Sequence, residues 1–261
     1  MKNFLSRLIT GAGILVAILV IIFSESRLLL FLGTELITLI CLEELFHAFY
    51  PHHLSRYWIW GQLLNFFANF SAYLFNIQLY LAVWTLAVVL LFILSIFQPH
   101  KSLQNLMQIL FSVIYITFLF CFVYFFPRDR QDYLLFIILI AWGSDTFAYL
   151  VGSQLGRTPV TEISPNKTWE GCIGGVVGAI LLCSLATLYF KDLSALTMVI
   201  VGAFGSVLAQ LGDVFASSLK RRSGIKDFSH ILRSHGGFLD RFDSVIFTIP
   251  YVWAVFVLYL F

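Results

Sequence analysis

A run of charged and hydroxyl side chains follows a long apolar stretch near the end of the chain. Asp213, Ser217 and Lys220 are four and three residues apart, so on a continuing helix they would share one face. Asp240 and Asp243 are spaced in the same way. Carboxylate oxygens suit Mg²⁺ and cations suit phosphate groups. The run therefore predicts a site for a metal-bound polyphosphate.

The cations of this run also have a simpler explanation. A basic triplet such as Lys220–Arg222 is typical of a cytoplasmic loop that lies against anionic lipid head groups. That explanation leaves out the four carboxylates interleaved with the cations, Asp213, Asp227, Asp240 and Asp243. Because interleaved acids weaken attraction to a lipid surface, they favour the polyphosphate site.

A second group of polar residues lies earlier in the chain. Asp145 falls inside an apolar stretch, where a carboxylate is costly enough to suggest a function; the alternative is a buried hydrogen bond to a neighbouring helix. Ser164 followed by Pro165 predicts the N-cap and first position of a helix. Free backbone amides near Lys167 would then form a phosphate cradle.

The elements that must position these residues are membrane helices. Of 261 residues, 60% are hydrophobic and only 11% are charged, whereas soluble domains are about 45–50% apolar and about 25% charged. A span needs about 20 mostly apolar residues, and the predicted spans are 8–23, 28–42, 56–76, 79–97, 106–126, 132–152, 171–190, 195–213 and 245–261. We expect an all-α polytopic membrane protein with about nine transmembrane helices.

Two of these spans have an alternative interpretation. The first resembles a signal peptide, but no cleavage site follows it, so we expect a retained helix. The span 56–76 contains several amide side chains and could instead be two interfacial pieces. The four cysteines lie apart in apolar runs, and we interpret them as buried hydrophobic residues.

The distribution of cations predicts the orientation in the membrane. Of the 16 Lys and Arg residues, 12 fall on the side that holds the N-terminus and both polar segments. The positive-inside rule makes this side cytoplasmic and places the predicted site at the cytoplasmic membrane interface. A net charge of +2 is too small to give the positive electrostatic field that would attract nucleic acid.

Glycine is concentrated in the second half of the chain, which has 13 of the 17 glycines after residue 142. Glycine lets helices approach closely in lipid, and the Gly174-x-x-x-Gly178 spacing favours such packing. We expect residues 1–131 to form supporting transmembrane helices and residues 132–261 to form the catalytic region.

The run from Ser217 to Asp243 resembles the signature of the phosphatidate cytidylyltransferases, or CDP-diacylglycerol synthases. The segments Asp145–Tyr149 and Ser164–Gly171 resemble other segments of that family, in the expected order. Two positions depart from the pattern. Ala216 stands where the family commonly has Glu, and Arg233-Ser234 stands where Pro-Gly normally precedes the signature histidine.

The resemblance implies an Mg²⁺-dependent enzyme of phospholipid biosynthesis in a bacterial-type inner membrane, which converts CTP and phosphatidate to CDP-diacylglycerol and pyrophosphate. The expected Mg²⁺ ligands are Asp213, Asp240 and Asp243, with Asp227 as a further choice. Groups expected to act on the phosphates as catalytic residues are Lys220, Arg221, Lys226, Asp227 and His235. Expected substrate-binding residues are Asp145, Lys167, Thr168, Ser217 and Arg241.

Three alternatives to this function remain open at the level of sequence. A secondary transporter would use Asp145 and the glycine-interrupted helices as a midplane site, but most polar residues here gather in one connection between spans. A CTP-using lipid kinase or nucleotidyltransferase with another acceptor is the second alternative. A divergent, weakly active member is the third, because of the two departures from the pattern. A homodimer is compatible with the sequence.

Overall fold

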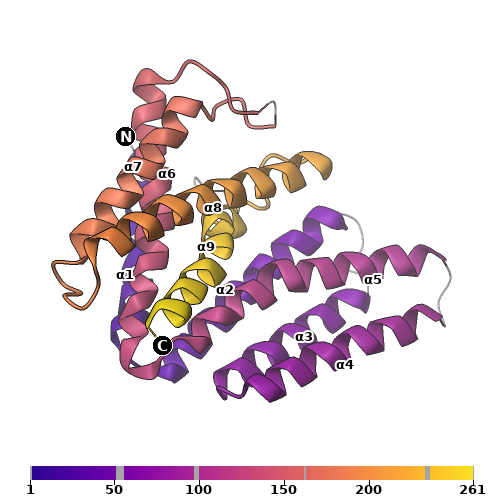
Figure 1. The fold of residues 1–261 in the computed structure, drawn as a ribbon. Helices are drawn as coiled ribbons and strands as arrows, with labels where there is room; N and C mark the ends of the chain where they lie inside the picture. Colours follow the sequence, from indigo (N-terminus) through magenta and orange to yellow (C-terminus); the bar gives the residue numbers. More distant parts are fainter. Residues whose placement is uncertain (1, 51–55, 97–99, 162, 233–235, 261) are drawn as a thin grey trace. The chain divides into compact units, whose positions relative to one another are not determined.

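The computed structural model describes residues 2–50, 56–96, 100–161, 163–232 and 236–260. Among these residues the chain forms nine α-helices, and the only β pairing is an isolated bridge between Pro159 and Thr168 (Figure 1). The predicted all-α fold is confirmed. The chain divides into two compact units, one made of residues 1–131 and 227–239 and the other of residues 132–226 and 240–261.

The first unit contains five α-helices. They are α1 (Lys2–Phe23), α2 (Arg27–Phe49), α3 (Arg56–Tyr73), α4 (Ile77–Ile96) and α5 (His100–Val113), and α5 continues through a π-helical turn, Ile114–Phe118, and a 3-10 segment, Cys121–Phe125. α2 packs against α3, and α3 packs against α4 and α5. α2 begins at Arg27 because the hydroxyl of Ser26 accepts a hydrogen bond from the Leu29 N–H.

α3 is one continuous helix despite its amide side chains, so the alternative of two separate pieces is wrong. Asn65 and Asn69 are fully buried. Asn65 Nδ2 donates to Glu35 Oε1 at 3.0 Å, and Asn69 Nδ2 donates to Thr38 Oγ1 at 3.1 Å. Thr117 Oγ1 donates to Asn65 Oδ1 at 2.7 Å. Buried polar groups that satisfy one another can remain within a membrane helix.

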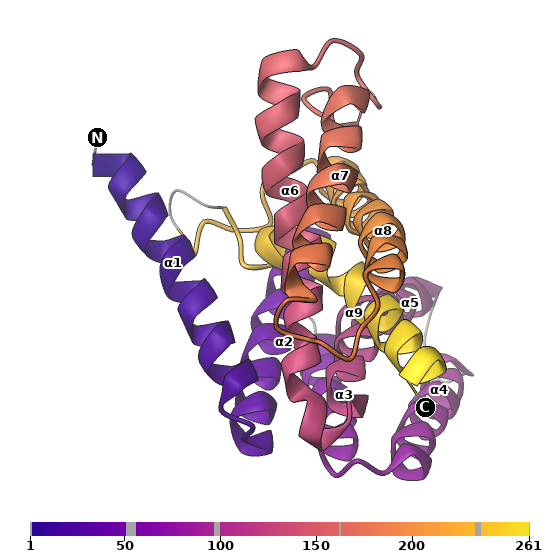
Figure 2. The same ribbon diagram turned by 60° about the vertical axis from the view of Figure 1, so that its left-hand side comes forward.

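The 3-10 segment η3 (Arg128–Leu134) crosses the boundary between the units, because residues 128–131 belong to the first unit and residues 132–134 to the second. The second unit also contains α6 (Leu135–Leu155), α7 (Trp169–Ala186), α8 (Ala195–Arg222) and α9 (Leu239–Leu260, from its second residue). α7 packs along α6 and also against α8 (Figure 2). A Cβ added at Gly174 would collide with Val151, and one added at Gly178 would collide with Phe147. The packing interpretation of these two glycines is confirmed.

Four described segments are long and apolar enough to cross a membrane, namely Gln104–Phe125, Arg128–Leu155, Trp169–Ala186 and Ala195–Arg222. Gly11–Phe23 and Ile77–Leu90 are shorter apolar helical stretches. α2 falls outside this group because it carries three glutamates, Glu35, Glu43 and Glu44, within one span length. This pattern of apolar helices is that of a polytopic membrane protein.

Candidate active site

α8 is the element that organises the site. It is 28 residues long and continues past Asp213 to Arg222. Ser217 Oγ donates to Asp213 Oδ1 at 3.4 Å, and Lys220 follows on the same side of the helix. The shared face predicted for Asp213, Ser217 and Lys220 is therefore confirmed.

The lysine on this face is buried in an ion pair. Lys220 Nζ lies 2.6 Å from Asp240 Oδ1, and the two side chains are 11% and 4% exposed. Asp240 is in the first turn of α9. A buried ion pair recovers its desolvation cost only in part, so its presence is better explained by a functional need for charge at this position than by stability.

A second ion pair joins α8 to the loop before α7. Lys167 Nζ lies 2.5 Å from Asp213 Oδ2, and both side chains are about one quarter exposed. The loop is held at its base because Val160 N–H donates to the Lys167 carbonyl at 2.9 Å and Trp169 N–H donates to the Thr158 carbonyl at 3.0 Å. These backbone hydrogen bonds fix the position from which Lys167 reaches Asp213.

The predicted start of α7 is wrong. The N-cap is Thr168, whose Oγ1 accepts from the Gly171 N–H at 3.2 Å, and the helix begins at the next residue. Ser164 and Pro165 lie in a turn instead, because this dipeptide suits a turn as well as a helix start. The Lys167 N–H donates to the Ser164 carbonyl at 3.0 Å. The Lys167 N–H therefore already has a partner, and the phosphate cradle stays a prediction that would have to use other amides.

Three carboxylates from three helices approach one another in the second unit. Asp145 on α6, Asp213 on α8 and Asp243 on α9 are near enough to repel one another. Ser244 Oγ donates to Asp145 Oδ2 at 3.0 Å, so the intramembrane carboxylate does bond to a neighbouring helix. α8 and α9 are close here, since a Cβ at Gly212 would lie 2.6 Å from the Asp243 carbonyl oxygen.

The chemistry of these carboxylates suits a divalent cation, but their positions in this structure do not form a metal site. Their oxygens are the ligands that Mg²⁺ prefers, and a cation would relieve their mutual repulsion. Within the described ranges, however, no three Asp, Glu, His or Cys side chains are grouped closely enough to hold a metal ion. Asp213 and Asp240 are each paired with a lysine instead.

We call the residues brought together in this unit the charged cluster. Its members are Asp145, Lys167, Asp213, Lys220, Asp240, Arg241 and Asp243. The predicted Arg221 and Lys226 have exposed side chains close in sequence to the cluster, and Arg221 Nη1 donates to the Ile225 carbonyl at 3.1 Å. Asp227 belongs to the first unit, and His235 and Arg233-Ser234 lie outside the described residues.

Two supporting residues were missed by the sequence-based reasoning. Ser244, which binds Asp145, directly follows the signature aspartate in an apolar helix, and this placement of a hydroxyl was the available signal. Glu170 accepts from the backbone N–H groups of Arg157 at 3.1 Å and Thr158 at 3.3 Å, which ties the loop to α7. Ala216, the first departure from the family pattern, is fully buried in packing contacts.

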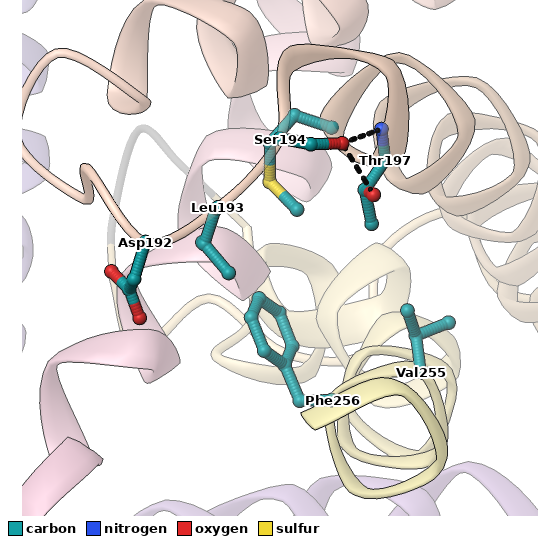
Figure 3. A pocket seen from close by; sticks show the side chains of 7 residues that line it. Asp192, Leu193, Ser194, Thr197, Val255 and Phe256 are labelled. Carbon is teal, nitrogen blue, oxygen red and sulfur yellow. Dashed lines mark hydrogen bonds between the residues drawn. The ribbon is translucent and has the colours of Figure 1, made fainter. Parts of the chain in front are cut away.

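A cavity of about 200 Å³ lies at the opposite end of α8, where the helix begins (Figure 3). Its lining residues are Asp192, Leu193, Ser194, Thr197, Met198, Val255 and Phe256. Ser194 caps α8 by accepting from the Thr197 N–H, and Asp192 accepts from the Tyr133 hydroxyl at 2.7 Å. None of the predicted site residues lines this cavity.

Curated relatives of the chain are named phosphatidate cytidylyltransferase. The protein of Staphylococcus aureus (strain COL) is 43% identical over 144 residues, which are 54% of this chain and 55% of the relative. That of Bacillus subtilis (strain 168) is 38% identical over 146 residues, 53% of this chain and 54% of the relative. That of Aquifex aeolicus (strain VF5) is 34% identical over 166 residues, 62% of each chain.

The matched part of the chain thus spans about half the length of the first two relatives and somewhat more of the third. A sequence model described as the cytidylyltransferase family extends much further and matches residues 5–259. Because that match runs through every helix that supplies the charged cluster, the chain belongs to the cytidylyltransferase family.

Proposed function

We propose that this protein is a membrane nucleotidyltransferase that joins CTP and phosphatidate to give CDP-diacylglycerol and pyrophosphate. The observation that carries the proposal is the charged cluster, which brings lysines and aspartates from α6, α8, α9 and one loop together within a single unit. The names of the relatives support the choice of substrates.

The arrangement suits a reaction whose main barrier is repulsion between anions. A phosphomonoester carries about −1.5 to −2 charges at pH 7, and CTP brings a triphosphate. The attacking phosphate oxygen is already largely ionised, so a general base is scarcely needed. Catalysis then rests on positioning and on neutralising charge. Lys167 and Lys220 would supply fixed charges, and the exposed Arg221 and Lys226 would hold CTP phosphates or the leaving pyrophosphate.

The position of the cluster along α8 suits a lipid substrate. Apolar side chains are exposed along the first part of this helix, as far as Leu211, which is 52% exposed. Charged residues begin at Asp213. A phosphatidate whose tails lie in the bilayer would place its phosphate near this transition, where Ser217, Thr168 and Arg241 would contact it.

Asp145, Asp213 and Asp243 offer the oxygen atoms that suit Mg²⁺, but their side chains would have to come closer together to hold the ion. Asp240 would be a further ligand if it exchanged its contact with Lys220. The ion, when bound, would neutralise charge on the phosphates of CTP. We further propose that the cluster faces the cytoplasm, the side from which CTP arrives, and that residues 132–261 form the catalytic region while residues 1–131 support it.

The proposal is tested with the detergent-purified protein, CTP and phosphatidate, with and without Mg²⁺. We expect Mg²⁺-dependent formation of CDP-diacylglycerol and pyrophosphate in equal amounts. Asp213→Asn should lower turnover by at least about 100-fold, the usual weight of an electrostatic catalytic group. Asp129→Asn, which changes an exposed acid outside the cluster, serves as the matched control.

Three outcomes would contradict this proposal. Formation of CDP without pyrophosphate would indicate a CTP-using lipid kinase. Equal turnover in Asp213→Asn and wild type would remove the role given to the charged cluster. Absence of any CTP-dependent product from the folded wild-type protein would remove the activity itself.

A further inference from the structure

Glu44 on α2 is a buried acid that the proposed chemistry does not use. Its residue is only 2% exposed. Its carboxylate accepts three hydrogen bonds, from Ser229 Oγ at 2.5 Å, from the Phe238 N–H at 2.7 Å and from the Leu239 N–H at 2.7 Å. All four residues belong to the first unit. The donors come from a segment 185 to 195 residues further along the chain.

The three donors come from the two ends of one segment, residues 227–239. Ser229 lies near its beginning, and Phe238 and Leu239 lie at its end, after the two glycines of the signature. The Glu44 carboxylate therefore contacts Ser229 as well as Phe238 and Leu239, the two residues that follow the signature glycines. An acid in the N-terminal half of the chain thus holds residues next to the signature of the C-terminal half.

The carboxylate also explains why residue 237 is glycine. A Cβ at Gly237 would lie 2.7 Å from Glu44 Oε2 and 2.9 Å from the Ser229 backbone nitrogen, and the second of these atoms cannot move aside easily. Gly236, which precedes it, has a φ of 76°, a conformation that glycine adopts without strain. Gly237 is thus required for the close approach to Glu44, and Gly236 provides the left-handed backbone conformation just before it.

The same contacts fix the beginning of α9. Leu239 is the first residue of that helix, and its N–H, like that of Phe238, has no partner within the helix. A carboxylate that accepts these N–H groups is favoured by the helix dipole and by its charge-assisted hydrogen bonds. Asp240 is the next residue and Asp243 is one turn further along.

We propose that Glu44 is a positioning residue for the cytidylyltransferase reaction, because its carboxylate orients the first turn of α9 and thereby the Asp240 carboxylate that pairs with Lys220. This inference rests on the proposed function. Glu44 acts through the backbone N–H groups of Phe238 and Leu239, which directly precede Asp240.

The chemistry of the contact requires an acid rather than an amide. The site around Glu44 offers three donors, and a carboxylate is an acceptor at both oxygens. The amide of Glu44→Gln has one acceptor oxygen, and its NH₂ group would face a backbone N–H or the Ser229 hydroxyl. Glu44→Asp keeps the charge but is shorter by one methylene, so it should keep only part of the contact.

The test compares Glu44→Gln and Glu44→Asp with Glu43→Gln. Glu43 is the adjacent acid on α2, and it accepts from Trp58 Nε1 instead of from the loop. We expect Glu44→Gln to lower kcat by about 10- to 100-fold, the range typical of residues that orient a functional group by hydrogen bonding without contacting the substrate themselves. KM for both substrates should change by less than about threefold. Glu44→Asp should recover part of kcat, and Glu43→Gln should match wild type.

Hydrogen exchange supplies a measurement that does not depend on activity. In Glu44→Gln the amides of Phe238 and Leu239 should exchange faster, while those in the middle of α3 keep their wild-type rates. Ser229→Ala, which removes one donor and leaves the carboxylate, should give a smaller change of the same kind. If Glu44→Gln does not fold, Ser229→Ala and Glu44→Asp decide the inference.

The outcomes separate the two proposals. Wild-type kcat in Glu44→Gln, unchanged exchange at Phe238 and Leu239, or accelerated exchange throughout the first unit would each overturn the positioning role. Failure of the wild-type protein to use CTP and phosphatidate would overturn the proposed function instead, and the hydrogen-exchange result would still decide whether Glu44 holds the start of α9.

Discussion

At the scale of single residues, the Lys220–Asp240 pair shows how two opposite charges can be kept buried in this site. Both side chains are nearly excluded from solvent. Removing one partner of such a pair leaves an uncompensated buried charge, whereas replacing both partners by neutral groups is often harmless to stability. Stability and activity should therefore respond differently to single and double substitution.

We predict that Lys220→Met lowers the free energy of unfolding by about 3–5 kcal/mol and abolishes cytidylyl transfer. The double variant Lys220→Met/Asp240→Asn should regain most of the stability and none of the activity. Thermal unfolding in detergent, followed by the CTP and phosphatidate assay, measures both. A double variant that regained activity would show that the pair has only a structural role.

Spacing within one helix was enough to predict the face shared by Asp213, Ser217 and Lys220, since that geometry follows from the helical repeat. The partners of these residues could not be predicted in the same way. Asp240 and Lys167 come from other elements, and which of the four aspartates meets which cation depends on how helices pack. The contacts of Glu44 with Ser229, Phe238 and Leu239 could not be predicted for the same reason.

At the scale of elements, hydrophobic runs predicted where helices lie better than where they start. A run of apolar residues located α7, but Ser164 was predicted as its N-cap, whereas the N-cap is Thr168. Only Thr168 has a hydroxyl that accepts from the Gly171 N–H. Similarly, the amides of α3 weakened its sequence pattern, because their buried partners on other helices are invisible in the local sequence.

Thr168 was predicted to bind substrate, but in the structure it caps α7, and this role predicts how substitutions change stability. Thr168→Val keeps the shape of the side chain and removes the acceptor, so it should destabilise the protein by about 1 kcal/mol, as the loss of an N-cap does. Thr168→Ser should be nearly neutral. If Thr168→Val kept wild-type stability but raised KM for either substrate about tenfold, the hydroxyl would be a substrate contact rather than a cap.

At the scale of the whole molecule, the division of the chain does not follow the order of the sequence. The segment 227–239 is surrounded in sequence by residues of the second unit, yet it belongs to the first unit. Composition and glycine content suggested a supporting half and a catalytic half, but neither quantity shows that a signature loop is held by α2. Such long-range contacts depend on buried hydrogen bonds, which leave little trace in a hydropathy pattern.

The distribution of Lys and Arg predicts which end of α8 faces the cytoplasm. The end near Arg222 should be cytoplasmic and the loop before Ser194 should be external. We predict that Lys191→Cys, an exposed position in that loop, reacts with a membrane-impermeant maleimide in intact cells. Arg222→Cys, exposed at the other end of α8, should react only after the membrane is opened.

Both variants are made with Cys172→Ser, because Cys172 is the one half-buried cysteine among the four, and the other three are buried. Labelling of Arg222→Cys in intact cells, with protection of Lys191→Cys, would place the charged cluster on the external side. Cytosolic CTP could not reach it there. The proposed reaction would then fail on access alone, whatever the chemistry of the aspartates and lysines that α8 brings together.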